Sequence, residues 1–114
     1  MSEHDEQKAL IQWCDFKGYP YDLIYANANG GKRHIGTAKK LKAEGVKAGI
    51  PDLFLPFPND GYHGLYIEMK FGKGSLTDNQ KIWIGRLENE GYCCSTCWGW
   101  DEAKLIISGY VGMI

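Results

Sequence analysis

Three side chains that could together form a catalytic site lie on two short apolar segments of this 114-residue chain. Asp52 is in the segment 50–55, and Glu68 and Lys70 stand two residues apart in the segment 64–71. Alternate residues of a β-strand face the same side, so Glu68 and Lys70 should share one face of their strand. Two neighbouring carboxylates repel unless a cation lies between them, and oxygen ligands favour Mg²⁺ or Mn²⁺. The pattern therefore predicts a divalent-metal site with a lysine at its edge.

The chemistry predicted for such a site is hydrolysis of a phosphodiester. A bound divalent ion can polarise the phosphate and lower the pKa of a bound water, and Lys70 could orient that water or stabilise developing charge. The alternative is a surface ion pair between Glu68 and Lys70, with Asp52 simply at a strand end. Because the E-x-K tripeptide is common on amphipathic strands, it does not decide between the two by itself.

Hydrophobic periodicity and turn residues predict the elements that would hold these side chains. The turn-rich residues 56–61 suit an antiparallel hairpin between the segments at 50–55 and 64–71, which would bring Asp52 beside Glu68. The order is helix, three strands, helix, strand, helix, which is an α/β fold in one domain, residues 1–114. The expected elements are a helix from Ser2 to Gly18 with Asp5 in its capping pair, strands at 21–27, 50–55 and 64–71, a helix at 78–90 started by Thr77 and Gln80, a strand at 92–98, and a last helix capped by Asp101.

The net charge is −1, but positive charges are concentrated in one segment. Residues 32–47 hold six cations and one acid, Glu44, for a local charge of +5. Such a patch attracts phosphates even in a protein that is neutral overall, although a solvated basic loop would have the same composition. Glycines interrupt this segment, so we expect a loop with one short helix near residues 37–44. The cations are Lys32, Arg33, Lys39, Lys40, Lys42 and Lys47.

Composition argues against several other classes of protein. No apolar run approaches the ~18 residues of a membrane span, and the acidic start is unlike a secretory signal, so we expect a cytoplasmic protein with no membrane partner. Of the four cysteines, at 14, 93, 94 and 97, three lie in one predicted strand, which is poor geometry for a disulfide framework. Cys94 and Cys97 form a C-x-x-C pair, but the histidines show no spacing that would complete a zinc site.

One acid of the first helix does not follow the apolar pattern. Glu6 lies four residues before Leu10, on the same stripe of the helix as the apolar residues. It could contribute to the metal site, or it could place a negative charge in the first helical turn, where the helix dipole favours it. From the residues alone, the second explanation is favoured.

The combination of motifs is more specific than its parts. Pro51-Asp52, followed across a hairpin-length gap by Glu68-x-Lys70, resembles the PD-(D/E)xK nuclease superfamily. The surrounding motifs are similar to those of the VRR-NUC family, the virus-type replication-repair nucleases, over nearly the whole chain. These motifs are Gly45-Val46-Lys47-Ala48-Gly49-Ile50-Pro51-Asp52-Leu53, Glu68-Met69-Lys70, Leu76-Thr77-x-x-Gln80, Gly91-Tyr92 and Asp101-Glu102-Ala103.

The resemblance implies a restriction-endonuclease-like core, with a central mixed sheet flanked by helices, that cleaves DNA with Mg²⁺ or Mn²⁺. Lys70 matches the catalytic lysine of the family. Gln80 matches a glutamine that faces the site, although its capping position explains it equally well. The implied metal ligands are Asp52, Glu68, the backbone carbonyl of Met69, and Glu6 as the acid of the first helix. No small-molecule cofactor is expected.

The resemblance also implies a substrate and an assembly. Stand-alone members of this size resemble homodimeric Holliday-junction resolvases, whereas larger relatives cut flaps or ends. Because the domain accounts for the whole sequence, we expect a homodimer acting on branched DNA, in the host cytoplasm if the protein is virus-encoded. A junction has two opposed strands to cut, and two sites related by a two-fold axis fit that geometry.

Two alternatives stay open. A flap- or end-processing nuclease would share the chemistry and differ only in substrate geometry. A non-catalytic DNA-binding module would use the basic segment to hold phosphates and keep the acids for structure, so it would bind without turnover. The residues expected to contact DNA are Lys32, Arg33, Lys39, Lys40, Lys42, Lys47 and Lys73.

Overall fold

Four strands in the described part of the chain form one mixed sheet. The computed structural model describes residues 1–28 and 35–112. In the sheet order β1-β2-β3-β4, the first two pairs are antiparallel, while β3 and β4 are parallel. The strands are β1 (Tyr25–Ala26), β2 (Leu53–Leu55), β3 (Leu65–Lys70) and β4 (Cys93–Trp98). The mixed sheet expected from the sequence is confirmed.

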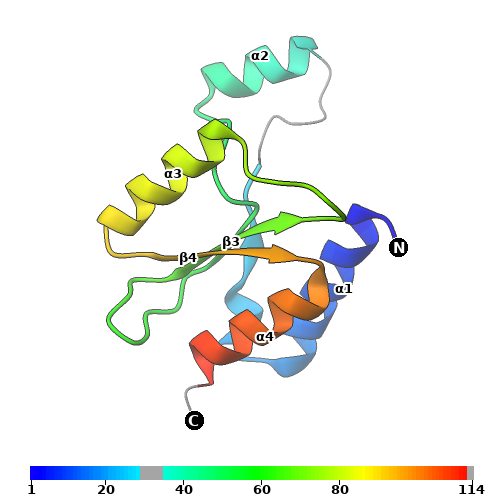
Figure 1. Ribbon diagram of the computed structural model, residues 1–114, viewed down its shortest axis with the longest axis vertical. Coiled ribbons are helices and arrows are strands. Elements are labelled where there is room, and N and C mark those ends of the chain that lie inside the picture. Colours follow the sequence, from blue (N-terminus) through cyan, green and yellow to red (C-terminus); the bar gives the residue numbers. More distant parts are fainter. Residues whose placement is uncertain (29–34, 113–114) are drawn as a thin grey trace.

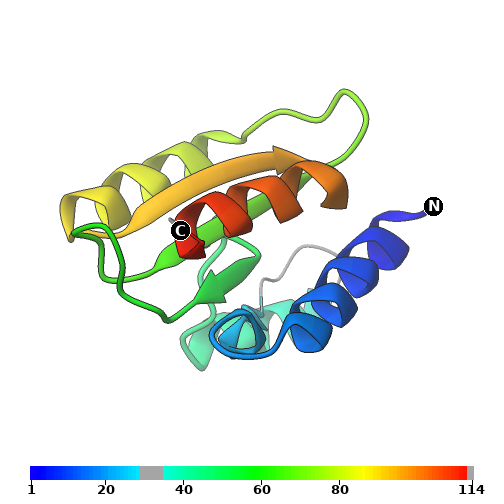
Figure 2. The same ribbon diagram turned by 90° about the horizontal axis from the view of Figure 1, so that it is seen from below.

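Helices cover both faces of this sheet. Figure 2 shows α3 on one face and α1 and α4 on the other. The predicted order of helix, three strands, helix, strand and helix is confirmed, with the short helix α2 between β1 and β2. No helix in the described ranges is long and apolar enough to cross a membrane. The helices are α1 (Glu3–Lys17), α2 (Ile35–Ala43), α3 (Asp78–Asn89) and α4 (Trp100–Val111), with a 3₁₀ turn, η1 (Tyr21–Leu23), between α1 and β1.

The two predicted capping pairs start α1 and α3. At α1, the Asp5 N–H donates to Ser2 Oγ at 3.1 Å, and the Ser2 N–H donates to the Asp5 carboxylate at 3.1 Å. At α3, Thr77 and Gln80 exchange the same two bonds, at 3.2 and 2.9 Å. Each pair satisfies N–H groups that a helix start would otherwise leave unpaired. The sequence signals for both helix starts are thus confirmed.

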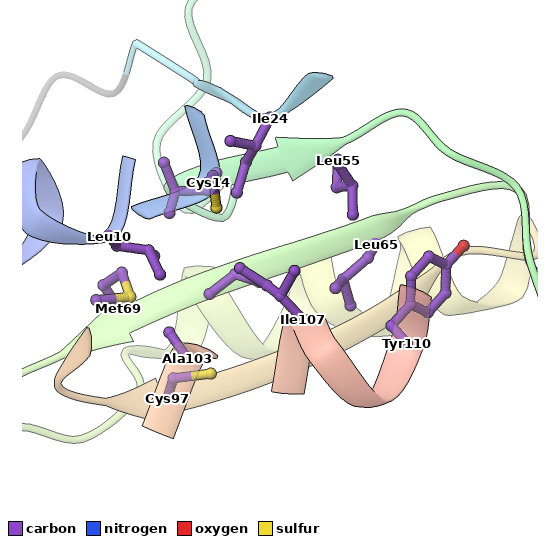
Figure 3. Close-up of a cluster of buried hydrophobic side chains, with 12 residues drawn as sticks. Leu10, Cys14, Ile24, Leu55, Leu65, Met69, Cys97, Ala103, Ile107 and Tyr110 are labelled. Atoms are coloured by element: carbon purple, nitrogen blue, oxygen red, sulfur yellow. The ribbon is translucent and has the colours of Figure 1, made fainter. Parts of the chain in front are cut away.

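The apolar core lies between the sheet and the helices α1 and α4 (Figure 3). Leu10 of α1 and Ile107 of α4 are fully buried in it. Because alternate strand residues face opposite sides, Glu68 and Lys70 are left on the other face of β3. One face of β3 therefore packs against the apolar core, and the other can contribute side chains to a functional site. The buried residues of β3 on the core side are Leu65, Ile67 and Met69.

The first predicted strand is shorter than expected. Instead of a strand over 21–27, the turn η1 precedes a two-residue β1. The Tyr21 ring packs edge-to-face on Trp13 of α1 at 5.5 Å, and Lys17 Nζ lies 5.2 Å from the centre of the Tyr21 ring. These contacts hold the start of the segment against α1, so only β1 itself reaches β2.

The start of α4 also differs from the prediction. Asp101 does not cap the helix, because α4 already begins at Trp100 and its N-cap residue is Gly99. Asp101 lies in the first turn, where the helix dipole favours its charge. Gly99 provides no side-chain bond, so an acceptor for the first N–H groups must come from another element or from water.

Helix α2 carries part of the basic segment and stands apart from the sheet. Figure 1 shows it in cyan, beyond the end of the sheet and past the start of α3. The helix expected near residues 37–44 is present at Ile35–Ala43. The segment therefore presents its charge to solvent. Its exposed cations are Lys39, Lys40, Lys42 and, after the helix, Lys47, while Lys32 and Arg33 lie outside the described residues.

Candidate active site

The β2–β3 hairpin brings two carboxyl groups together, those of Asp52 and Glu68, called here the carboxyl pair. Leu53 pairs with Ile67 in the antiparallel register, and the next position in that register places Asp52 opposite Glu68. Asp52 Oδ2 accepts the Met69 N–H at 2.8 Å, so the aspartate side chain is bonded across the strand pair. The hairpin predicted from the sequence thus sets the two acids beside each other.

Main-chain contacts on two sides fix the segment that carries Asp52. The Asn27 N–H donates to the Asp52 carbonyl at 2.8 Å, and Asn27 Nδ2 donates to the Pro51 carbonyl at 2.9 Å. On the other side, Gly49 has a φ of 95° and lies so close to α3 that a Cβ there would come within 2.8 Å of the Asn79 backbone. Glycine meets both requirements. These neighbours limit how far Asp52 can move.

Glu68 is the acid that is almost completely buried among the described residues, with 3% of its surface exposed. Gln80 Nε2 donates to Glu68 Oε2 at 3.3 Å, while Glu68 Oε1 has no hydrogen-bond partner in the described ranges. Burial, and then the adjoining Asp52 carboxyl, raise the pKa of Glu68 to about 8, and Lys70 offsets part of this rise. A buried carboxylate costs free energy unless a cation or a donor reaches it. The unbonded Oε1 therefore marks a place for a positively charged partner.

Gln80 joins the start of α3 to the carboxyl pair. Its Oε1 accepts the Thr77 N–H at 2.9 Å in the capping box, which leaves its amide NH₂ directed at Glu68. The capping bond thereby decides which end of the amide faces the acid. Both contacts considered for Gln80 from the sequence, the helix cap and the contact with the site, are present.

Lys70 lies two residues beyond Glu68 on the same face of β3, and its side chain is half-buried. The Gly99 N–H donates to the Lys70 carbonyl at 3.1 Å, which extends the pairing of β3 with β4 by one residue beyond Trp98. Its positive charge opposes the rise in the pKa of Glu68. The end of β3 that carries Lys70 is thus fixed by a hydrogen bond from the residue that follows β4.

The carboxyl pair and Lys70 line a cavity of about 1190 Å³. One wall is a continuous face of α1, because its lining residues recur at helical spacing. Sequence reasoning missed this wall, although Glu3, Gln7 and Ile11 at i, i+4 and i+8 indicate a shared face. The lining residues of α1 are Glu3, His4, Gln7, Lys8, Ile11 and Gln12, and the rest of the lining includes Asn27, Ala48, Gly49, Met69, Gly74 and Gln80.

Glu6 is not among the residues that line this cavity. Its Oε1 lies 3.4 Å from the N–H of Trp100, the first residue of α4, and a Cβ on Gly99 would meet the same oxygen at 3.1 Å. The geometry therefore does not support Glu6 as a metal ligand, because its carboxylate contacts the start of α4. Glu3, one turn earlier, is the acid of α1 that faces the cavity.

The basic residues expected to bind DNA do not line the cavity, as far as the structure describes them. Besides Lys70, the basic residues in its lining are His4 and Lys8 of α1. Sequence reasoning passed over these two because they stand among the acids of the first helical turns. The predicted DNA-binding residues that the structure describes are all exposed and are not part of the lining: Lys39, Lys40, Lys42, Lys47 and Lys73.

The carboxyl pair fits a hard divalent ion. In the described ranges, no group of three or more His, Cys, Asp or Glu side chains is arranged to hold a metal, so two carboxyl groups would be the side-chain ligands. Mg²⁺ commonly binds through one or two carboxylates and keeps several waters, for which the cavity has space. Asp52 and Glu68 would hold such an ion, Glu68 through its unbonded Oε1. Met69, whose backbone carbonyl is the third predicted ligand, also lines the cavity.

The C-x-x-C pair does not form a second metal site, because Cys94 and Cys97 lie on opposite faces of β4. Cys97 is fully buried in the core, whereas Cys94 Sγ lies 3.9 Å from the Ile84 carbonyl of α3. Burial raises the pKa of both thiols to about 12, so both stay protonated near neutral pH.

Comparison with known proteins agrees with this geometry. The family model of the VRR-NUC domain matches residues 1–100. A solved structure described as "VRR_NUC domain protein" has a TM-score of 0.84 and 32% sequence identity to this protein, and the match covers 98% of this chain and 89% of that one. No match was found among curated proteins. By its fold and by these matches, the chain belongs to the VRR-NUC domain family of nucleases.

Proposed function

We propose that this protein is a DNA endonuclease that requires Mg²⁺ or Mn²⁺ and hydrolyses phosphodiester bonds at the carboxyl pair. Membership of a nuclease family supports the class of reaction. The observation that carries the proposal is the end of the β2–β3 hairpin, where Asp52 and Glu68 are neighbours and Lys70 follows on the same face. The cavity of about 1190 Å³ next to them is large enough for a phosphate group and ordered water.

Each residue of the site has a role that its contacts support. Asp52 and Glu68 would hold the ion, which when bound would polarise the phosphate and lower the pKa of water. The Met69 N–H keeps Asp52 in place, and the Gln80 amide does the same for Glu68. Lys70 neutralises the negative charge that develops on the phosphate during hydrolysis.

The exposed lysines outside the cavity attract the phosphates that flank the cut. This attraction acts over about 8 Å at physiological salt, so these lysines need no fixed place in the cavity wall. Lys47 directly precedes Ala48 and Gly49, which line the cavity. A DNA strand that leaves the cavity on this side therefore meets the basic segment next.

We infer further that the enzyme acts on branched DNA as a homodimer. One chain carries one carboxyl pair, so paired cuts in two opposed strands require a second copy placed by a two-fold axis. Exposed aromatic side chains could form the contact between copies, among them Tyr19, which is 74% exposed, and Trp98, which is 44% exposed. Trp98 Nε1 already donates to the Gly74 carbonyl at 2.8 Å, whereas Tyr19 makes an edge-to-face contact with Phe57 at 6.1 Å, so Tyr19 is the better candidate of the two.

Cleavage of four labelled substrates tests the proposal: a four-way junction, a flap, a nicked duplex and a plain duplex. We expect paired cuts in the junction with Mg²⁺ or Mn²⁺ and no cuts in EDTA. The Asp52→Asn protein, which keeps the size of the side chain but not its charge, should bind and not cut.

The outcome also separates the alternatives. Equal cutting of all four substrates would rule out structure selectivity, and preference for the flap would support an end-processing enzyme. Binding without cutting under any metal condition would support a non-catalytic module. Sedimentation of the protein alone should give twice the mass of one chain, and a monomer that makes paired cuts would contradict the dimer.

A further inference from the structure

The start of α4 depends on an acid from another helix. Its N-cap residue, Gly99, contributes no side-chain bond, although the first N–H groups of a helix need acceptors. Glu6, which is 94 residues away in sequence, places its Oε1 3.4 Å from the Trp100 N–H. A negative charge at a helix N-terminus is also electrostatically favourable. The acid that interrupts the apolar stripe of α1 thus has a partner in α4.

Gly99 is suited to this contact in two independent ways. Its φ of 86° lies in the region that favours glycine, and a Cβ there would meet Glu6 Oε1 at 3.1 Å. The Glu6 carboxylate therefore lies against both residues of the Gly99–Trp100 turn.

The same turn holds the end of β3. The Gly99 N–H donates to the Lys70 carbonyl at 3.1 Å. Trp98, which is opposite Lys70 in the parallel register, donates from its Nε1 to the Gly74 carbonyl at 2.8 Å. The segment 98–100 thereby contacts the main chain at the proposed catalytic lysine and again four residues later.

We propose that Glu6 is a positioning residue for Lys70. Glu6 holds the turn at Gly99, the turn holds the Lys70 carbonyl, and the lysine side chain is thereby kept at the edge of the carboxyl pair. This inference rests on the proposed function, because it concerns the lysine of that site. It gives Glu6 a task that differs from metal binding, and the two tasks predict different kinetics.

Kinetics of two Glu6 variants separate these tasks. Glu6→Ala should lower kcat about tenfold and change KM and the half-saturating Mg²⁺ concentration less than about twofold, because the metal and DNA contacts stay. Glu6→Gln, which keeps an oxygen acceptor at the same reach, should recover kcat to within about threefold. A metal ligand would instead require more Mg²⁺ in both variants. Glu102→Gln is the matched control, since it removes an acid from the first turn of α4 without removing the bond to Trp100.

Amide hydrogen exchange of the protein without DNA tests the structural link by itself. In Glu6→Ala, the Gly99 and Trp100 amides should exchange at least about threefold faster relative to amides of α3, because the turn loses a hydrogen-bond partner. If Glu6→Ala does not fold, Glu6→Asp keeps the charge but shortens the reach, and the same changes in exchange and kcat are expected.

Unchanged exchange at Gly99 would overturn the proposal whatever the cleavage result. Faster exchange with wild-type kcat would overturn it as well, because Lys70 would then not depend on the turn. A wild-type protein that cuts no DNA in Mg²⁺ or Mn²⁺ would instead refute the proposed function. In that case the exchange data would still decide whether Glu6 orders the Lys70 segment.

Discussion

The hairpin that carries the carboxyl pair and the helix α2 that carries the lysines are held in different ways. Asp52 is bonded across the strands, Glu68 is bonded to α3, and the Lys70 main chain is bonded to the end of β4. The lysines of α2 are exposed on a helix that stands beyond the sheet (Figure 1). Reacting groups must be placed within fractions of an ångström, whereas attraction to phosphates falls off slowly with distance. Under the proposed function, chemistry and DNA attraction are therefore carried by separate parts of this chain.

If the two regions are separable, substitutions in each should change different quantities. The largest effect is expected in the hairpin. Lys70→Ala should lower kcat by ~100-fold or more, because it removes a positive charge aimed at the developing charge on the phosphate. Junction binding should change little, since most affinity comes from phosphate contacts elsewhere. Single-turnover cleavage and a binding isotherm measure the two quantities, with Lys81→Ala on α3 as control, and retained cleavage would remove Lys70 from the mechanism.

The opposite pattern is expected from α2. Replacing Lys39, Lys40 and Lys42 together by alanine should weaken junction binding and lower the slope of log K against log salt by up to about three units, since each lysine neutralises about one phosphate. The rate at saturating DNA should stay near that of the wild type. Binding measured across a salt series checks this, and an unchanged slope would mean that α2 faces away from DNA.

The stability of a Gly49→Ala variant shows how rigidly the segment before Asp52 is held by its contacts. Gly49→Ala should destabilise the protein by about 1–3 kcal/mol, because its φ is positive and a Cβ would strike the Asn79 backbone. Gly85→Ala on α3 is the matched control, since nothing lies within 4 Å of a Cβ there and alanine favours a helix. Denaturant unfolding compares the two, and equal stability of both variants would show that the segment can shift.

Per pH unit, the smallest effect expected is a dependence of stability on pH that comes from Glu68. The folded protein keeps the Glu68 proton up to a pH of about 8, whereas an unfolded glutamate loses it near 4.5. Unfolding therefore releases a proton between these values, so the free energy of unfolding in EDTA should fall as pH rises, by at most about 1.4 kcal/mol per pH unit from this group. Glu68→Gln should flatten the curve over this window. Identical slopes for the two proteins would show that the acid is not buried as described.

The features of the fold that could be predicted are those set by neighbouring residues. The Ser2–Asp5 and Thr77–Gln80 pairs marked both helix starts, because the interacting groups lie three residues apart in sequence. The start of α4 could not be predicted this way, since its acceptor is Glu6 at a distance of 94 residues. A local search for a capping side chain finds Asp101 instead.

The same limit applies to the site. The period of a strand placed Glu68 and Lys70 on one face, and a hairpin-length gap brought Asp52 beside them. The α1 wall could be recognised as a shared face of Glu3 and Gln7, but nothing in the sequence indicates which part of the sheet that face meets. Tertiary packing decides which part of the sheet the α1 face meets. It also places the Glu6 carboxylate against the start of α4, outside the cavity lining.

The claim on which the other roles depend is that Asp52 and Glu68 bind one divalent ion together. Titration of Mn²⁺ into metal-free wild-type, Asp52→Asn and Glu68→Gln proteins tests it most directly. We expect one bound ion per chain, an affinity that falls at least about tenfold in each single variant, and little further loss in the double variant. Wild-type affinity in either single variant would contradict a shared site.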